Sequence, residues 1–154
     1  MMSRTHSALY RGAFFLALIA LLGACKGTQY TPANLPERQL SFGNGGGFAA
    51  AYHEYLLLEN GQLFVKKGIT GEHIALPAVK KRLAKAWYKE ASVLFSDSIA
   101  FNYPGNIYYF VQWKNADYEN RITWGDPVHP DVEKMKALYD ELMTTVLPAD
   151  DKSK

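Results

Sequence analysis

The sequence has one cysteine, Cys25, among its 154 residues, so no disulfide bond can form within the chain. It has no long hydrophobic run either, because residues 13–22 (AFFLALIALL) fall far short of the roughly 20 residues that span a bilayer. The chain also has no large excess of charge of one sign, because it holds 17 Lys and Arg residues and 15 Asp and Glu residues. These absences exclude a disulfide scaffold and a helical membrane span.

The N-terminal residues follow the order of a signal peptide. Arg4 and Arg11 supply positive charge, residues 13–22 are apolar, and small residues follow Leu22 up to Cys25. This order resembles a bacterial lipoprotein signal peptide with its lipobox (Leu22-Gly23-Ala24-Cys25), in which the cysteine thiol is acylated and the chain is cut just before it. The alternative is an ordinary secretory signal cut near Ala24.

The resemblance implies that residues 1–24 are a signal peptide and that acylated Cys25 anchors the protein to a lipid bilayer without spanning it. Lys26 stands where many lipoproteins of the inner membrane carry aspartate, which favours the outer membrane. Without Arg4 and Arg11, Lys and Arg fall from 17 to 15 and equal the 15 Asp and Glu. A neutral chain argues against nucleic acid as a partner.

Composition divides the remaining chain into three parts. Residues 25–37 hold the lipidated cysteine and a stretch with two prolines and no periodicity, which predicts a flexible tether. Residues 38–147 are predicted to form a single α+β domain, and residues 148–154 are predicted to form a disordered tail.

The pattern predicts an antiparallel sheet of about four strands with two amphipathic helices on one side, in the order ββαββα. The glycines at 43–47 are expected to end the first strand, and Asn60-Gly61 is expected to form a type I′ hairpin turn. The four strands of this order are expected at residues 48–58, 62–67, 107–113 and 121–124, with a further short strand at residues 38–42, and the helices are expected at residues 77–95 and 130–147.

Each expected helix has an apolar face. The first is predicted to bury Val79, Leu83, Ala86, Trp87 and Leu94, and the second to bury Val132, Met135, Leu138, Tyr139, Leu142 and Val146. The first helix also carries a basic stripe, which is interpreted as a solvated face or, alternatively, as a contact for anionic lipid or an acidic partner. That stripe contains Lys81, Arg82, Lys85 and Lys89.

No catalytic or metal-binding pattern is present. His53, His73 and His129 are widely separated and lack metal-ligand spacing, so we expect no metal and no cofactor. No serine lies in a nucleophile motif. Asp126 and Asp131 flank His129, but a turn and a helix cap explain them.

The glycine run at 43–47 is followed by a strand and not by a helix, so it does not predict a phosphate-binding loop. It predicts a bulge or a tight corner or, alternatively, a flexible lip that contacts a partner. The turns Pro104-Gly105-Asn106 and Trp124-Gly125-Asp126-Pro127 are expected at the same end of the sheet. The residues proposed for partner contact are Gly45, Gly46, Gly47, Phe48, Pro104, Gly105, Asn106 and Trp124.

The domain resembles a group of small lipoproteins of Gram-negative bacteria over about residues 42–147. The matching features are Gly45-Gly46-Gly47-Phe48 before a strand with Tyr52 and Tyr55, Glu59-Asn60-Gly61-Gln62-Leu63, Pro104-Gly105-Asn106, and Trp124-Gly125. This resemblance implies no established activity.

Gly46-Gly47-Phe48 is also similar to the first strand of emfourin-type inhibitors of metalloproteases. Those proteins usually continue with Ala-Gly, where this chain has Ala49-Ala50, and they generally lack a lipobox. The sequence therefore predicts a membrane-anchored, non-catalytic binding module with an envelope protein as its partner. A protease inhibitor is the alternative, and an enzyme of unrecognised type is the less favoured reading.

Overall fold

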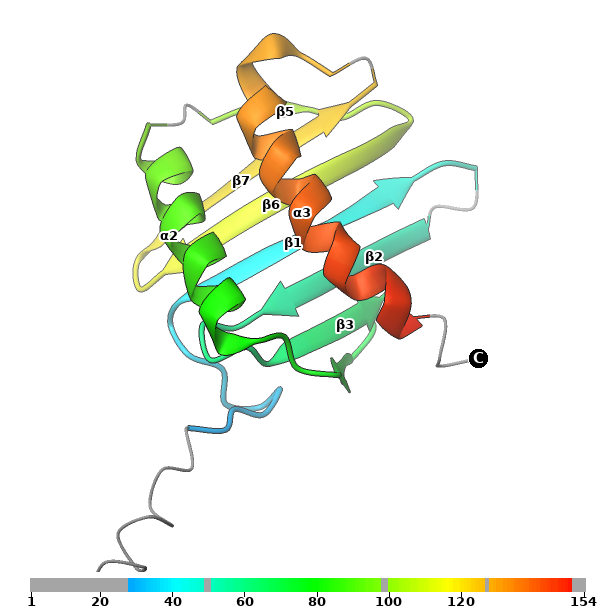
Figure 1. The fold of residues 1–154 in the computed structure, drawn as a ribbon. Helices are drawn as coiled ribbons and strands as arrows, with labels where there is room; N and C mark the ends of the chain where they lie inside the picture. Colours follow the sequence, from blue (N-terminus) through cyan, green and yellow to red (C-terminus); the bar gives the residue numbers. More distant parts are fainter. Residues whose placement is uncertain (1–27, 49–50, 98–99, 127, 151–154) are drawn as a thin grey trace, which may run out of the picture.

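The computed structural model describes residues 28–48, 51–97, 100–126 and 128–150 (Figure 1). The strands are β1 (Gln39–Gly46), β2 (Ala51–Leu57), β3 (Leu63–Lys67), β4 (His73–Leu76), β5 (Asn102–Tyr103), β6 (Ile107–Asn115) and β7 (Tyr118–Gly125). The helices are α2 (Lys81–Asp97), the 3-10 turn η1 (Pro130–Val132) and α3 (Glu133–Asp150).

All seven strands belong to one sheet in the order β4-β3-β2-β1-β6-β7-β5. Neighbouring strands are antiparallel except β5 and β7, which are parallel, so the sheet is mixed. Both α2 and α3 cover the same face of the sheet (Figure 1). The predicted four-stranded antiparallel sheet in the order ββαββα is therefore wrong, because four strands precede α2 and three follow it.

The first strand passes through the glycines that were expected to end it. Gly43 lies opposite Phe110 and Gly45 opposite Tyr108 on β6, and these rings occupy the space that glycine side chains leave empty. A Cβ atom on Gly43 would lie 3.0 Å from the Phe110 ring, and one on Gly45 would lie 2.5 Å from Tyr108 Oη. Aromatic cover from the neighbouring strand thus offsets the weak strand propensity of glycine.

Two edge strands explain the rest of the difference. β4 has four residues and β5 has two, and both lack the hydrophobic alternation that marks a half-buried strand. β5 is recognisable only from its pairing, in which Tyr103 lies beside Trp124 of β7.

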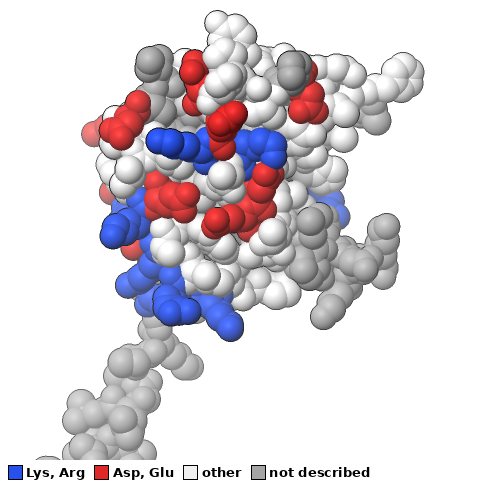
Figure 2. All heavy atoms as spheres, turned by 45° about the horizontal axis from the view of Figure 1, so that its top comes forward, with Lys and Arg blue, Asp and Glu red and all other residues white. Residues whose placement is uncertain are grey.

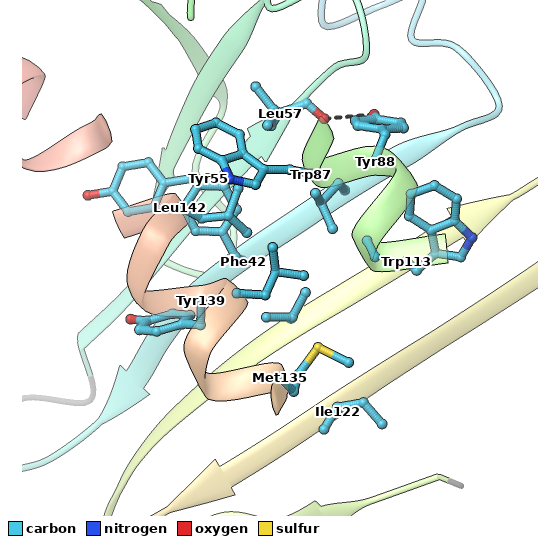
Figure 3. Packing of buried hydrophobic residues seen from close by; sticks show 14 of the residues in the cluster. Phe42, Tyr55, Leu57, Trp87, Tyr88, Trp113, Ile122, Met135, Tyr139 and Leu142 are labelled. Atoms are coloured by element: carbon cyan, nitrogen blue, oxygen red, sulfur yellow. Dashed lines mark hydrogen bonds between the residues drawn. The ribbon is translucent and has the colours of Figure 1, made fainter. Parts of the chain in front are cut away.

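The helices pack on the sheet through aromatic residues (Figure 3). Trp87 is buried as predicted, whereas Leu83 and Ala86 are exposed because the buried face is rotated toward Ala84, Tyr88, Ala91 and Phe95. Tyr88 Oη donates a hydrogen bond of 2.9 Å to the Leu57 carbonyl, which satisfies its hydroxyl in the core.

The apolar face predicted for α3 is confirmed at every position, from Val132 to Val146. The helix continues to Asp150, three residues beyond the predicted end.

The hairpin at Asn60-Gly61 is present, but its turn is not type I′. Gly61 has a positive φ of 94°, whereas Ala116 is the only non-glycine residue with positive φ in the described part of the chain. The Gly61 N–H donates to the Leu58 carbonyl and the Leu58 N–H to the Gln62 carbonyl, which gives a three-residue loop ending in a left-handed glycine.

The segment before β1 lies against this hairpin. The Tyr30 N–H donates to Gln62 Oε1 at 2.8 Å, and Gln62 Nε2 donates to the Tyr30 carbonyl at 2.9 Å. Tyr30 and Leu35 pack on the sheet face that carries no helix, over a small cluster formed by Leu56, Leu58 and Phe64. The part of the expected tether that begins at Thr28 thus makes specific contacts with the domain.

Candidate functional site

Four strand ends meet at one end of the sheet. Gly46 at the end of β1 pairs with Ile107 at the start of β6, and Tyr108 pairs with Gly125 at the end of β7. Tyr103 at the end of β5 lies beside β7. We call residues 46–48, 103–107 and 125 the rim.

Backbone contacts hold the rim together. The Gly47 N–H donates to the Asn106 carbonyl at 2.7 Å, which joins the turn after β1 to the loop before β6. Gly46 has a φ of 91°, and a Cβ there would lie 2.2 Å from the same carbonyl oxygen, so a larger residue does not fit. The turns at 46–48 and 104–106 therefore lie side by side.

The rim exposes large apolar side chains. Phe48 is fully exposed, Tyr103 is 72 % exposed and Ile107 is 49 % exposed. Pro104, Gly105 and Asn106 between them are exposed as well. Apolar side chains that protrude together from a tightly bonded backbone are typical of protein contact sites.

Trp124, also proposed for partner contact, is only 1 % exposed. Its ring packs edge-on against Tyr139 at 5.5 Å and lies 6.3 Å from Tyr109, on the helix-covered face. Its indole supports the rim from within the core and does not protrude.

A hollow of about 730 Å³ lies beside the rim, between the sheet and the start of α3. Apolar groups form much of its wall, including Phe101, Tyr103 and Met135, and His129 and Asp131 supply polar atoms. The Asp131 N–H donates to His129 Nδ1 at 3.3 Å, and the Asp131 carboxylate lies 3.4 Å from the same nitrogen. The His129 side chain therefore caps η1, whereas the cap was expected from the flanking aspartates, and both side chains are more than half exposed.

The three histidines among the described residues are not gathered. His53 on β2 pairs with Lys67 and His73 on β4 pairs with Lys66, which places their side chains on opposite faces of the sheet. His129 lies before η1. Across residues 28–48, 51–97, 100–126 and 128–150, no group of three His, Cys, Asp or Glu residues is placed to hold a metal ion.

The face without helices carries a cluster that sequence reasoning missed. Phe110 is fully buried there between the Tyr52 ring, stacked at 5.9 Å, and the Arg121 guanidinium, whose carbon lies 3.6 Å from the Phe110 ring centre. The Tyr52 hydroxyl donates to Glu54 Oε2 at 2.7 Å. Burial and this bond to a carboxylate raise the pKa of Tyr52 to about 12. Alternation along β2, β6 and β7 would have placed these residues on one face, but only once the strand register was known.

The sequence matches no protein-family model and no curated protein. None of the helices in the described residues is long and apolar enough to cross a membrane. Cys25 and the lipobox lie outside the described residues.

Proposed function

We propose that this chain is a lipid-anchored protein of the bacterial cell envelope, that it binds a protein partner through the rim, and that it is not an enzyme. The observation that carries the binding role is Phe48, which protrudes fully into solvent next to Gly47, whose N–H is bonded to the Asn106 carbonyl. An exposed aromatic side chain on a preorganised backbone loses little conformational entropy on binding.

The non-catalytic part of the proposal is supported by how the hollow is lined. Its polar side chains are His129, Asp131 and Asp97, with Tyr103 at the rim, and no serine, cysteine or lysine contributes to its wall. The imidazole already accepts the hydrogen bond that caps η1. The described part of this wall therefore offers no serine, cysteine or lysine for nucleophilic catalysis.

No contact favours the inhibitor alternative. β1 is the central strand, paired with β2 on one side and β6 on the other from Leu40 to Gly46. An inhibitor that offered residues 43–48 as a free edge would need unpaired backbone groups there, and only Gly47 and Phe48 extend beyond the ladder.

Photo-crosslinking in cells tests the rim. A photoreactive phenylalanine analogue at position 48 should give a discrete crosslinked partner, as should one at position 107. Val93 on α2 is a matched control, because it is 55 % exposed and belongs to a different surface. Crosslinks that arise from position 93 as readily as from position 48, or no crosslinks from either rim position, would overturn the proposal.

The anchor is tested separately. Cys25→Ser in the full chain should abolish incorporation of labelled palmitate and prevent cleavage of the precursor, because serine offers no thiol for acylation. Palmitate labelling that survives this substitution would overturn the proposed lipidation site.

A further inference from the structure

Basic side chains gather at the end of the domain opposite the rim. Lys80, Lys81, Arg82 and Lys85 are exposed at the start of α2, and Arg38 lies just before β1. Figure 2 shows Lys and Arg side chains grouped at the lower end of the molecule, where Figure 1 places the start of α2. We call these five residues the basic pole.

Most of this positive charge is not neutralised. Arg38 pairs with Glu59 at 3.1 Å, and its guanidinium also lies 5.6 Å from the Tyr88 ring centre. Glu59 and Glu37 are the carboxylates in the adjoining hollow, and among the described residues neither forms an ion pair with the four cations at the start of α2.

The start of α2 also has no acidic residue in its first turn. The amide dipoles of a helix make its N-terminus positive, so acidic residues are favoured there and cations reduce stability. The cations of α2 therefore add to the positive end of the helix dipole.

The N-terminal segment reaches the domain at this same pole. Thr28, Lys81 and Lys85 line one open hollow of about 610 Å³. Asn60 Nδ2 donates to the Thr28 carbonyl at 2.7 Å, and Gln62 holds Tyr30 two residues later. The position at which the chain joins the domain is thus fixed relative to the lysines.

We infer that the basic pole binds the phosphate headgroups of an anionic phospholipid surface, so that the domain has a second attachment besides its lipid anchor. This inference rests on the proposed acylation of Cys25. Three peptide units separate Cys25 from Thr28 and span at most about 11 Å, so an acylated Cys25 holds Lys81 and Lys85 close to the headgroups. The Debye length is about 8 Å at physiological salt, so the attraction acts when residues 25–28 hold the lysines closer to the headgroups than this full reach.

Binding at the basic pole directs the rim away from the membrane. β1 runs from Gln39, next to the pole, to Gly46 in the rim, and its eight residues extend over about 26 Å. Phe48 is then presented at the far side of the domain from the lipid, where a partner in the envelope can reach it.

The orientation is measured with full-length protein, processed in a bacterial host and reconstituted into vesicles. Acylation consumes the thiol of Cys25, so Ala86→Cys or Asn106→Cys supplies the only free thiol for a fluorophore. Ala86 is exposed beside the pole, and Asn106 is exposed in the rim. A quencher attached to lipid headgroups reports the proximity of each label to the surface.

Vesicles with phosphatidylglycerol should quench the label at position 86 more strongly than vesicles of phosphatidylcholine, since each basic residue near an anionic surface favours the bound orientation roughly five-fold. The label at position 106 should be quenched weakly in both. High salt and the double variant Lys81→Glu with Lys85→Glu should remove the difference at position 86. Lys134→Glu with Lys136→Glu, in the first turns of α3, is the charge-matched control and should leave it unchanged.

Co-flotation with vesicles distinguishes the two proposals. If the protein floats with both kinds of vesicle, its lipid anchor is intact. Equal quenching at position 86 in the two kinds of vesicle would then overturn the basic-pole inference. Quenching that does not respond to the charge reversal at Lys81 and Lys85 would overturn it as well. Full-length protein that floats with neither kind overturns the lipid anchor and the orientation that depends on it.

Discussion

The guanidinium carbon of Arg121 lies 3.6 Å from the centre of the Phe110 ring and covers it on the sheet face that no helix protects. Tyr52 stacks on the same ring at 5.9 Å, and Phe110 is fully buried as a result. The tip of the Phe110 ring lies against Gly43 of β1. One cation and one tyrosine thus shield this apolar side chain, where a second helical layer would otherwise be needed.

Arg121→Ala should lower the free energy of unfolding by about 1–2 kcal/mol, because it removes the cation–π contact and exposes Phe110 to water. Urea unfolding followed by tryptophan fluorescence measures the change. Arg121→Lys keeps the charge but not the planar group that stacks on the ring, so it should recover only part of the loss. An alanine variant as stable as the parent would show that the stacking does not stabilise the fold.

Gly43→Ala should destabilise the protein by about 2–3 kcal/mol. An added Cβ would lie 2.0 Å from the His53 carbonyl oxygen of β2 and 3.0 Å from the Phe110 ring, so the central strands must separate. Gly68→Ala is the control, because its positive φ costs about 1 kcal/mol while no atom lies within 4 Å of the added Cβ. Equal losses of stability in the two variants would contradict the proposed crowding at Gly43.

Gln62→Ala should release the N-terminal segment from the domain. The side-chain amide exchanges two hydrogen bonds with the Tyr30 backbone, and alanine can make neither. Limited proteolysis at residues 28–38 should accelerate, and global stability should fall by only about 1 kcal/mol. Gln62→Glu keeps the acceptor and loses the donor, and it should give an intermediate rate. Cleavage rates that are the same in all three proteins would rule out this amide as the clamp.

Stability should fall as the pH rises from about 10 to 12. The pKa of Tyr52 is raised to about 12 by burial and by its bond to Glu54, so the unfolded chain loses this proton near pH 10 while the folded protein keeps it. Burial also raises the pKa values of Tyr88 and Tyr139, which adds to the fall.

Urea unfolding at a series of pH values between 9 and 12 tests the contribution of Tyr52. Tyr52→Phe should make the decline of stability with pH shallower. The slopes of the variant and the parent should differ by less than about 1.4 kcal/mol per pH unit, the value for the loss of one full proton, because the ring is only half-buried. An unchanged pH dependence in this variant would contradict the assignment.

The helices were readable from the sequence because their burial repeats with the helical period. Trp87 and the whole apolar face of α3 lie in the core as predicted. The buried face of α2 was misjudged because small residues form part of it: Ala84 and Ala91 are fully buried, while the larger Leu83 is 39 % exposed.

The sheet was less predictable because its edges and centre depend on pairing. β5 is two residues long and exists only through its parallel contact with β7. The glycines of β1 have no intrinsic strand preference, and the rings that stabilise them belong to β6, far along the sequence.

The rim could be anticipated in part. Glycine and proline mark the turns at 46–48 and 104–106, and an antiparallel sheet can place such turns at one end. Their proximity depends on the β1–β6 register, which sets Gly46 opposite Ile107. The cluster of Tyr52, Phe110 and Arg121 was not foreseeable, because three strands must first align to bring it together.

The pairing of β1 with β6 also determines how the chain folds. β1 can form its hairpin with β2 early, but Gly46 meets Ile107 only after residues 47–106 have been positioned. Contacts between residues so distant in sequence form slowly, because loop closure costs entropy before pairing offsets it. A chain in synthesis therefore keeps one edge of its future central strand unpaired until β6 has emerged, and closing that edge is expected to be the slow step of folding.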